Sequence, residues 1–177
     1  MARYALLLRA VNLGPHNRVS MPDLRRLLGE RGYEDVATYL ASGNAVVTSA
    51  DDAEAVGRDV ADALRDAFGL DTPVLVRDHA ELAAVVAGNP FPEAATKPTT
   101  LHVAFLSAAP DPGAVAAIPP DVAAPDEFRF AGRHAYLHYP NGSGRSKLGA
   151  AVFKGLDVVA TSRNWNTVTA LAEMTAA

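Results

Sequence analysis

Residues 36–49 read VATYLASGNAVVTS, and the organisation of the whole chain can be worked out from this stretch. Residues 36–41 and 45–49 are extended segments on either side of Ser42, Gly43 and Asn44. Gly and Asn tolerate the positive φ that tight hairpin turns require. The stretch therefore predicts a β-hairpin with Gly43 or Asn44 at positive φ.

The hairpin is flanked on each side by one strand and one helix. Before it, the Leu-rich run 4–12 predicts a buried strand, and Ser20 can cap a helix that ends near Gly32. After it, apolar residues at every fourth position predict a helix from Asp51, and residues 73–77 suit a short strand. The first half of the chain therefore reads βαββαβ.

The second half repeats this order after a connector. A short helix and a Pro-rich linker are predicted for residues 79–98. The elements expected after them are strands at 100–107, 127–131, 135–139 and 158–161, and helices at 111–118, 146–155 and 164–174. We therefore expect an α+β fold of two successive ferredoxin-like (βαββαβ) units packed together, with a C-terminal helix: residues 1–78, the connecting segment 79–98, and residues 99–177.

The composition is that of an ordinary globular protein. Of the 177 residues, 49% are hydrophobic and 20% are charged, which argues against disorder. The chain has no cysteine, so disulfide frameworks, thiolate nucleophiles and cysteine-ligated metals are excluded. We read no secretory signal and no apolar run of membrane-spanning length, and therefore expect a cytoplasmic protein without a membrane partner.

The charges are distributed unevenly along the chain. Residues 1–35 carry a net charge of +2, residues 36–140 carry −8, and residues 141–177 carry +2. If the fold brings the two ends together, a local positive field would attract an anionic ligand. The alternative is that these are scattered, solvated surface charges.

The first polar cluster is Arg9 and Asn12 with the loop from Gly14 to Asn17. Arg9 is expected inside a strand made mostly of Leu, where a buried guanidinium needs a partner or a ligand. The alternative places Arg9 on an exposed face or in a local ion pair.

The second polar cluster is the glycine-rich run of residues 142–147, GSGRSK, which leads into a predicted helix. Such a loop can aim backbone N–H groups at an oxyanion, while Arg145 and Lys147 supply positive charge. The spacing is not that of a Walker A motif. An ordinary turn between a hairpin and a helix is the alternative.

The third polar cluster is the run RNWNT at residues 163–167. Asn164 or Asn166 can cap the last helix, and Trp165 suits a core position. Arg163 beside two amides is a combination that suits a phosphate, a carboxylate or a nucleobase.

Conventional catalytic and metal sites are not indicated. His134 and His138 fall on one face of a predicted strand but about 13 Å apart, which is too far for one metal ion. No set of nucleophile and general base can be named, so whether the protein is an enzyme stays open. No cofactor and no metal are expected.

Four segments together resemble a known bacterial family. They are LLRAVNLG at 7–14, YLASGN at 39–44, GRSKL at 144–148 and TSRNWNT at 161–167, and they resemble the uncharacterised family catalogued as domain of unknown function 1697. The resemblance implies a two-part α+β fold similar to paired ferredoxin-like units, and no established activity. The positions that match the family pattern are Arg9, Asn12, Gly14, Asn17, Met21, Ser42, Gly43, Asn44, Gly144, Arg145, Ser146, Lys147, Arg163, Asn164, Trp165, Asn166 and Thr167.

Three positions depart from that pattern. Ala10 and Pro15 stand where similar sequences usually have Gly, and Ala41 stands where Gln is usual. Because Pro15 has no N–H, an anion-binding nest in the first loop is less credible than a site in the C-terminal motifs.

Our leading hypothesis is a binding module for an anionic or phosphate-bearing small ligand in a basic groove between the halves. An enzyme of unknown class using the same groove is one alternative. A nucleic-acid-binding protein is another, disfavoured by the net charge and by the missing aromatic pattern of RNA-binding sheets. The ligand-binding candidates are Arg9, Asn12, Asn17, Ser42, Asn44, Arg145, Ser146, Lys147, Arg163, Asn164 and Asn166.

Overall fold

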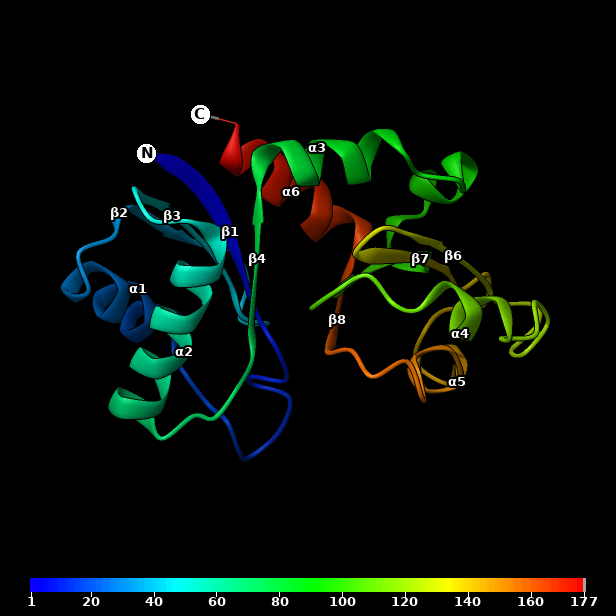
Figure 1. Cartoon of the computed structure of the whole chain (residues 1–177), viewed down its shortest axis with the longest axis horizontal. Coiled ribbons are helices and arrows are strands. Elements are labelled where there is room, and N and C mark those ends of the chain that lie inside the picture. The colour runs from blue at the N-terminus through cyan, green and yellow to red at the C-terminus, as the bar shows by residue number, and fades with distance from the viewer. Residues whose placement is uncertain (177) are drawn as a thin grey trace. The chain divides into compact units, whose positions relative to one another are not determined.

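The computed structural model describes residues 1–176 and contains two four-stranded antiparallel sheets with α-helices (Figure 1). The expected α+β class is confirmed. Contacts divide the chain into two compact units. The first comprises Met1–Ala84 with the C-terminal segment from Thr169 on, and the second comprises Val85–Val168. The boundaries therefore fall inside two helices, α3 (His79–Ala87) and α6 (Trp165–Thr175).

The first unit is built on the sheet order β2-β3-β1-β4, in which every neighbouring pair is antiparallel. Along the chain its elements are β1 (Ala2–Leu8), α1 (Met21–Glu30), β2 (Glu34–Thr38), β3 (Asn44–Ser49), α2 (Ala53–Phe68) and β4 (Val74–Asp78). Both helices begin with capping side chains, because Ser20 accepts from the N–H of Asp23 and Asp52 accepts from the N–H of Ala55. The helix positions thus follow from local polar residues.

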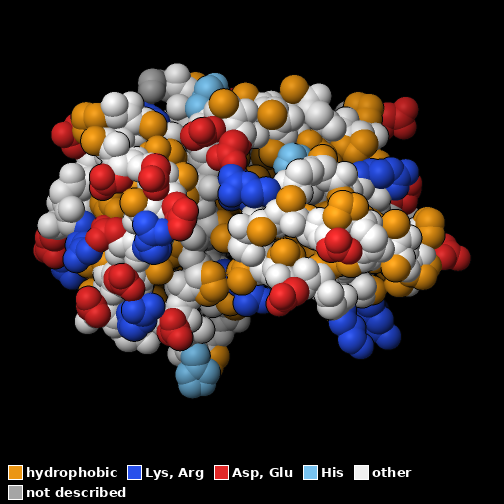
Figure 2. All heavy atoms as spheres, viewed as in Figure 1, with side chains coloured by type: hydrophobic (Ala, Val, Ile, Leu, Met, Phe, Trp, Pro, Cys, Tyr) orange, Lys and Arg blue, Asp and Glu red, His pale blue; other side chains and the backbone are white. Residues whose placement is uncertain are grey.

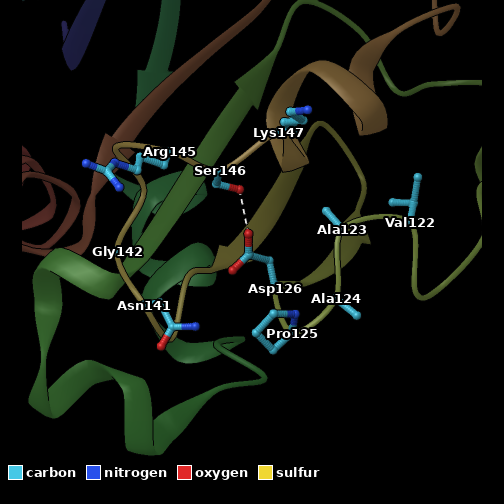
Figure 3. A pocket seen from close by; sticks show the side chains of 10 residues that line it. All are labelled: Val122, Ala123, Ala124, Pro125, Asp126, Asn141, Gly142, Arg145, Ser146 and Lys147. Carbon is cyan, nitrogen blue, oxygen red and sulfur yellow. Dashed lines mark hydrogen bonds between the residues drawn. The ribbon is translucent and has the colours of Figure 1, made fainter.

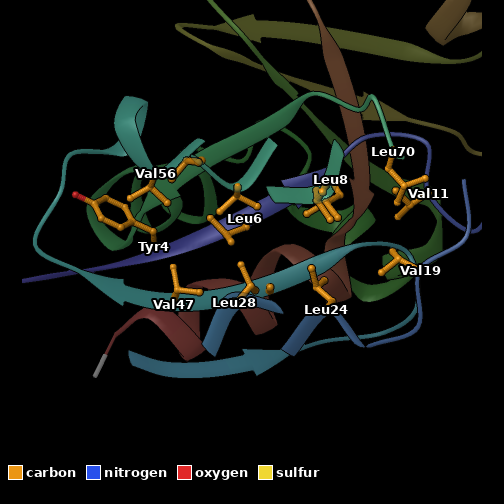
Figure 4. Close-up of a cluster of buried hydrophobic side chains, with 14 residues drawn as sticks. Tyr4, Leu6, Leu8, Val11, Val19, Leu24, Leu28, Val47, Val56 and Leu70 are labelled. Carbon is orange, nitrogen blue, oxygen red and sulfur yellow. The ribbon is translucent and has the colours of Figure 1, made fainter. Parts of the chain in front are cut away.

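The core of the first unit lies between the sheet and its two helices (Figure 4). Tyr4, Leu6 and Leu8 alternate along β1 and point to the same side, where Leu24 and Leu28 of α1 meet them. The opposite side of both helices carries charged residues, and Figure 2 shows carboxylates and cations interspersed there. One face of each helix is therefore apolar, as packing on a sheet requires.

The predicted hairpin is confirmed. β2 and β3 pair antiparallel and Gly43 has φ +90°, the left-handed conformation that glycine supplies without steric cost. β2 ends at Thr38, earlier than expected, because Leu40 also lies at positive φ and turns the chain away from the sheet.

The second unit has the sheet order β6-β7-β5-β8, again antiparallel throughout. Two 3-10 turns, η1 (Pro92–Thr96) and η2 (Pro98–Thr100), precede the first strand. Its elements are β5 (Leu101–Leu106), α4 (Pro112–Ala116), β6 (Glu127–Ala131), β7 (His134–His138), α5 (Leu148–Phe153) and β8 (Ala160–Asn164), followed by α6. Each strand thus has the same place in its sheet as its counterpart in the first unit.

Three further sequence-based boundaries were wrong, and all of them bear on candidate site residues. β1 ends at Leu8, so Arg9 follows the strand rather than lying inside it, because Ala10 and Asn12 adopt left-handed φ values of +56°. α5 begins at Leu148 and is only six residues long. β8 extends to Asn164, which places Arg163 inside the strand. None of the helices within residues 1–176 could cross a membrane.

Candidate functional site

A pocket of about 420 Å³ lies in the second unit, beside the loop that joins β7 to α5 (Figure 3). One wall is the segment 122–126, which leads into β6. The other wall is the glycine-rich loop, which contributes Asn141, Gly142, Arg145, Ser146 and Lys147. The second of the predicted polar clusters therefore lines a real concavity.

Ser146 connects the two walls of this pocket. Its hydroxyl donates to Asp126 Oδ2 at 2.5 Å, and the same oxygen accepts from the N–H of Leu148 at 3.0 Å (Figure 3). The loop is closed further by the N–H of Gly142, which donates to the carbonyl of Tyr139 at 2.9 Å. Ser146 thus fixes the loop against the segment before β6 and against the first residue of α5.

The loop presents two cations whose charge is not neutralised locally. Arg145 and Lys147 are both exposed, and neither forms an ion pair with any residue of the described part of the chain. Asp126, the acidic lining residue, is half-buried and holds the Ser146 hydroxyl. In Figure 3 the ends of Arg145 and Lys147 point away from each other on either side of the Ser146–Asp126 pair. The rim of the pocket is therefore positive. The Asp126 carboxylate accepts the hydrogen bond that joins the two walls.

Tyr139 supports the loop from the core side. Its side chain is 6% exposed and packs with Leu148 and Val152 of α5. Burial, and secondarily the charge of Asp126, raise the pKa of the Tyr139 phenol to about 12. The neutral phenol is thus favoured in the folded protein.

This shift predicts how stability changes in alkali. Above pH 10 the unfolded chain releases the Tyr139 proton while the folded protein keeps it, so the free energy of unfolding falls as the pH rises from 10 to 12. The loss attributable to this group is at most about 2–3 kcal/mol. We expect Tyr139→Phe to reduce the fall between pH 10 and 12, as measured by urea unfolding at a series of pH values. Parallel curves for the two proteins would show that another group is responsible.

The first polar cluster is used mainly to shape loops of the first unit. Arg9 is exposed, and its backbone bonds to Pro73 and to the Thr72 hydroxyl. The Asn12 amide donates to the carbonyls of Val19 at 2.9 Å and Ala41 at 2.7 Å. Asn12 therefore joins the β1–α1 loop to the β2–β3 turn.

Three more candidate residues of the first unit lie in the same two loops. Asn44 is fully buried, and its Nδ2 donates to the Tyr39 carbonyl at 2.8 Å and to the Ser42 hydroxyl at 3.0 Å. Asn17 has φ +55° and accepts a bond from the N–H of Asn12 through its carbonyl. The first-unit candidates are thus neighbours in space. Their hydrogen bonds fix the backbone conformation of the two loops.

The third polar cluster is divided between a strand and a helix cap. Arg163 is 7% exposed, and its Nη1 donates to the Thr161 hydroxyl at 2.7 Å and to the Ser162 carbonyl at 2.9 Å. Burial lowers the pKa of Arg163 to about 10, although a guanidinium remains charged at physiological pH. Asn164 Oδ1 accepts from the N–H of Thr167 at 3.0 Å at the start of α6, while Asn166 is exposed. None of these residues lines the pocket of the second unit.

Comparison with known proteins shows which family the chain belongs to. The model of a family described as Protein of unknown function (DUF1697) matches residues 1–136. The chain belongs to this family. No curated protein matches it. A conserved bacterial protein from Streptococcus pneumoniae has a similar structure, with a TM-score of 0.72, 21% sequence identity and an alignment that covers 98% of each chain. At that identity the likeness shows the fold alone.

The DUF1697 match includes the joined loops of the first unit and ends within β7, before the pocket loop. Inside the matched region the structure reveals a feature that sequence analysis missed. Arg77 lies on β4 where Arg163 lies on β8, is 3% exposed, and donates to the Val76 carbonyl at 2.9 Å. The next residue, Asp78, accepts from the N–H of Glu81 at 2.8 Å at the start of α3, as Asn164 does for α6.

The repeated Arg-Asx pair was visible in the sequence as RD at 77–78 and RN at 163–164. Aligning the two predicted βαββαβ halves would have found it. Because both copies combine a buried guanidinium with a helix cap, the pair is a structural element of each of the two units. Within residues 1–176 no group of three or more His, Asp or Glu side chains is arranged to hold a metal ion.

Proposed function

We propose that the second unit binds a small anionic molecule, bearing a phosphate or a carboxylate, in the pocket beside the glycine-rich loop. The observation that carries this proposal is the pair of exposed cations, Arg145 and Lys147, on a loop that Ser146 fixes to Asp126. A volume of about 420 Å³ falls in the range typical of small-molecule sites.

The chemistry of the two cations supports an oxyanion rather than a neutral ligand. The planar guanidinium of Arg145 can donate two parallel hydrogen bonds to a phosphate or carboxylate, and the ammonium of Lys147 adds a point charge. The loop is held by its own hydrogen bonds, so less ordering entropy is lost on binding. The negative charge of Asp126 repels an anionic group placed beside the Ser146–Asp126 hydrogen bond. The charged group of the ligand is therefore expected at the rim, beside Arg145 and Lys147.

The proposal concerns the second unit alone. Arg163 and Asn164 are engaged in β8 and in the cap of α6, so they are not among the proposed contacts. We also propose that both units are ferredoxin-like. The orders β2-β3-β1-β4 and β6-β7-β5-β8, with a helix after the first and third strand of each unit, support this.

A titration with inorganic phosphate and a series of phosphorylated and carboxylated small molecules tests the pocket. We expect at least one to perturb the amide NMR signals of residues 141–147, and to stabilise the protein by about 2.7 kcal/mol at 100 times its Kd. The double variant Arg145→Gln/Lys147→Gln should bind it at least about tenfold more weakly, because two charge-assisted bonds are lost.

Lys154→Gln is the matched control, since Lys154 is an exposed cation at the end of α5 that does not line the pocket. It should leave the affinity unchanged. If the control weakened binding as much as the double variant, the loss would be due to general electrostatic attraction. If no compound perturbed the signals of residues 141–147, the pocket would not be an anion site.

A further inference from the structure

Two leucines in the first unit are largely exposed. Leu13, in the β1–α1 loop of residues 9–20, is 80% exposed, and Leu40, in the β2–β3 turn of residues 39–43, is 57% exposed. Isolated exposed apolar residues are common and need no explanation. These two differ because their loops are joined to each other.

The joint between the loops is made of two independent contacts. Asn12, the neighbour of Leu13, donates to the carbonyl of Ala41, the neighbour of Leu40. Gly43 lies so close to Val11 that a Cβ placed on it would be 2.6 Å from the Val11 Cγ2. We call this braced pair of loops, residues 9–20 and 39–43, the leucine tip.

The backbone conformation of Leu40 indicates that this leucine costs stability. Leu40 has φ +57°, in the left-handed region that favours Gly and Asn and disfavours branched, bulky side chains. A leucine that compensated for this strain would be buried in the core, but more than half of its surface is in solvent. A residue that is unfavourable for folding and exposed suggests a role in contact with another molecule.

The β1–α1 loop of the leucine tip carries positive charge and no acidic residue. Residues 1–22 contain no Asp or Glu, and the turn 39–43 carries no charge at all. Arg9, His16 and Arg18 are exposed in the β1–α1 loop. The Arg18 Nε donates to the carbonyl of Gly14, and no carboxylate among residues 1–176 pairs with Arg18. This contrasts with Arg26 of α1 and with Arg58 and Arg65 of α2, which are paired with Asp or Glu.

We propose that the leucine tip is a docking surface for an acidic polypeptide segment whose apolar side chains cover Leu13 and Leu40. Complementary charge selects this occupant: a carboxylate would face Arg18, while the leucines supply the apolar contact. A second copy docking through the same surface would bring each cation against its own counterpart. This surface lies in the first unit and is independent of the proposed pocket.

A short synthetic peptide that alternates leucine and glutamate is the probe. With the full-length protein we expect it to shift the amide NMR signals of residues 10–18 and 39–43, with an affinity that falls as salt is added. The double variant Leu13→Ser/Leu40→Asn should bind at least about tenfold more weakly, because both apolar contacts are lost. Leu13→Met/Leu40→Met, which keeps apolar side chains, should bind within about twofold of the wild type.

The stability of the variants supplies a second measurement. If Leu40 had a purely structural role, its replacement would lower the urea midpoint. Leu40→Asn places a residue that tolerates left-handed φ, so we expect a higher urea midpoint together with weaker peptide binding. For charge, Arg18→Gln should weaken binding about threefold, while Arg26→Gln, an exposed cation already paired with Asp23, should not.

Four results would overturn the proposal. The first is the absence of shifts at millimolar peptide, and the second is equal binding of a peptide in which lysine replaces glutamate. The third is binding to phosphatidylserine vesicles in place of the peptide, which would make the leucine tip a membrane contact. The fourth is concentration-dependent dimerisation that Leu13→Ser/Leu40→Asn abolishes, which would assign the tip to a second copy.

Discussion

Gly43→Ala is expected to lower the free energy of unfolding by about 3 kcal/mol. Gly43 has φ +90°, so any side chain there is strained. An added Cβ would also lie 2.6 Å from the Val11 Cγ2 and 2.9 Å from the Leu8 Cβ, and both distances require core atoms to move. Because Leu8 and Val11 are fully buried, the surrounding atoms have no room in which to relax.

Gly69→Ala separates the two causes. Gly69 ends α2 with φ +64°, but nothing lies within 4 Å of the position a Cβ would take. This control therefore carries the conformational cost alone, about 1 kcal/mol. Urea unfolding of both variants measures the difference. If the two substitutions cost the same, the close approach of the hairpin turn to β1 does not contribute and only backbone conformation matters at Gly43.

The fold could be predicted to the level of element order and hairpin position, because those depend on local signals. The turn at residues 42–44, the caps at Ser20 and Asp52, and the four-residue spacing in α2 all act within a few residues. The end of β1 could not be predicted in the same way. Residues 9–12 continue the run from which a strand at 4–12 is predicted. Ala10 and Asn12 nevertheless adopt left-handed φ values, because Asn12 bonds to Val19 and Ala41, which are not its neighbours in sequence.

The candidate site could be predicted as residue types but not as partners. The loop 142–147 was singled out for Arg145 and Lys147, and these do line a pocket. Asp126, which holds Ser146, could not be identified from the sequence, because a bond between residues 20 positions apart leaves no local pattern. The strand predicted at 158–161 ends before Arg163, whereas β8 continues to Asn164 and buries Arg163 inside the strand.

Asn44→Asp is expected to be among the most destabilising single-atom changes in the chain, at about 4 kcal/mol near neutral pH. Asn44 is fully buried, and its Nδ2 donates to the carbonyl of Tyr39 at 2.8 Å and to the Ser42 hydroxyl at 3.0 Å. Aspartate replaces that donor by an oxygen, which would face the carbonyl oxygen of Tyr39 as a buried negative charge. Asn44→Ala should cost less, about 2–3 kcal/mol, since it removes the donor without adding a charge.

The pH dependence distinguishes a buried charge from simple loss of a hydrogen bond. Burial should raise the pKa of the introduced carboxyl above its unfolded value of about 3.9, so that the folded variant binds a proton that the unfolded chain has released. Its deficit relative to wild type should therefore shrink as the pH falls from 7 towards 4, whereas the deficit of Asn44→Ala should stay constant. Urea unfolding of the three proteins across this range makes the comparison, with Ser42→Ala as the control for the exposed hydroxyl in the same turn. A deficit in Asn44→Asp that did not change with pH would mean that the carboxylate reaches solvent, and that the turn opens at little cost.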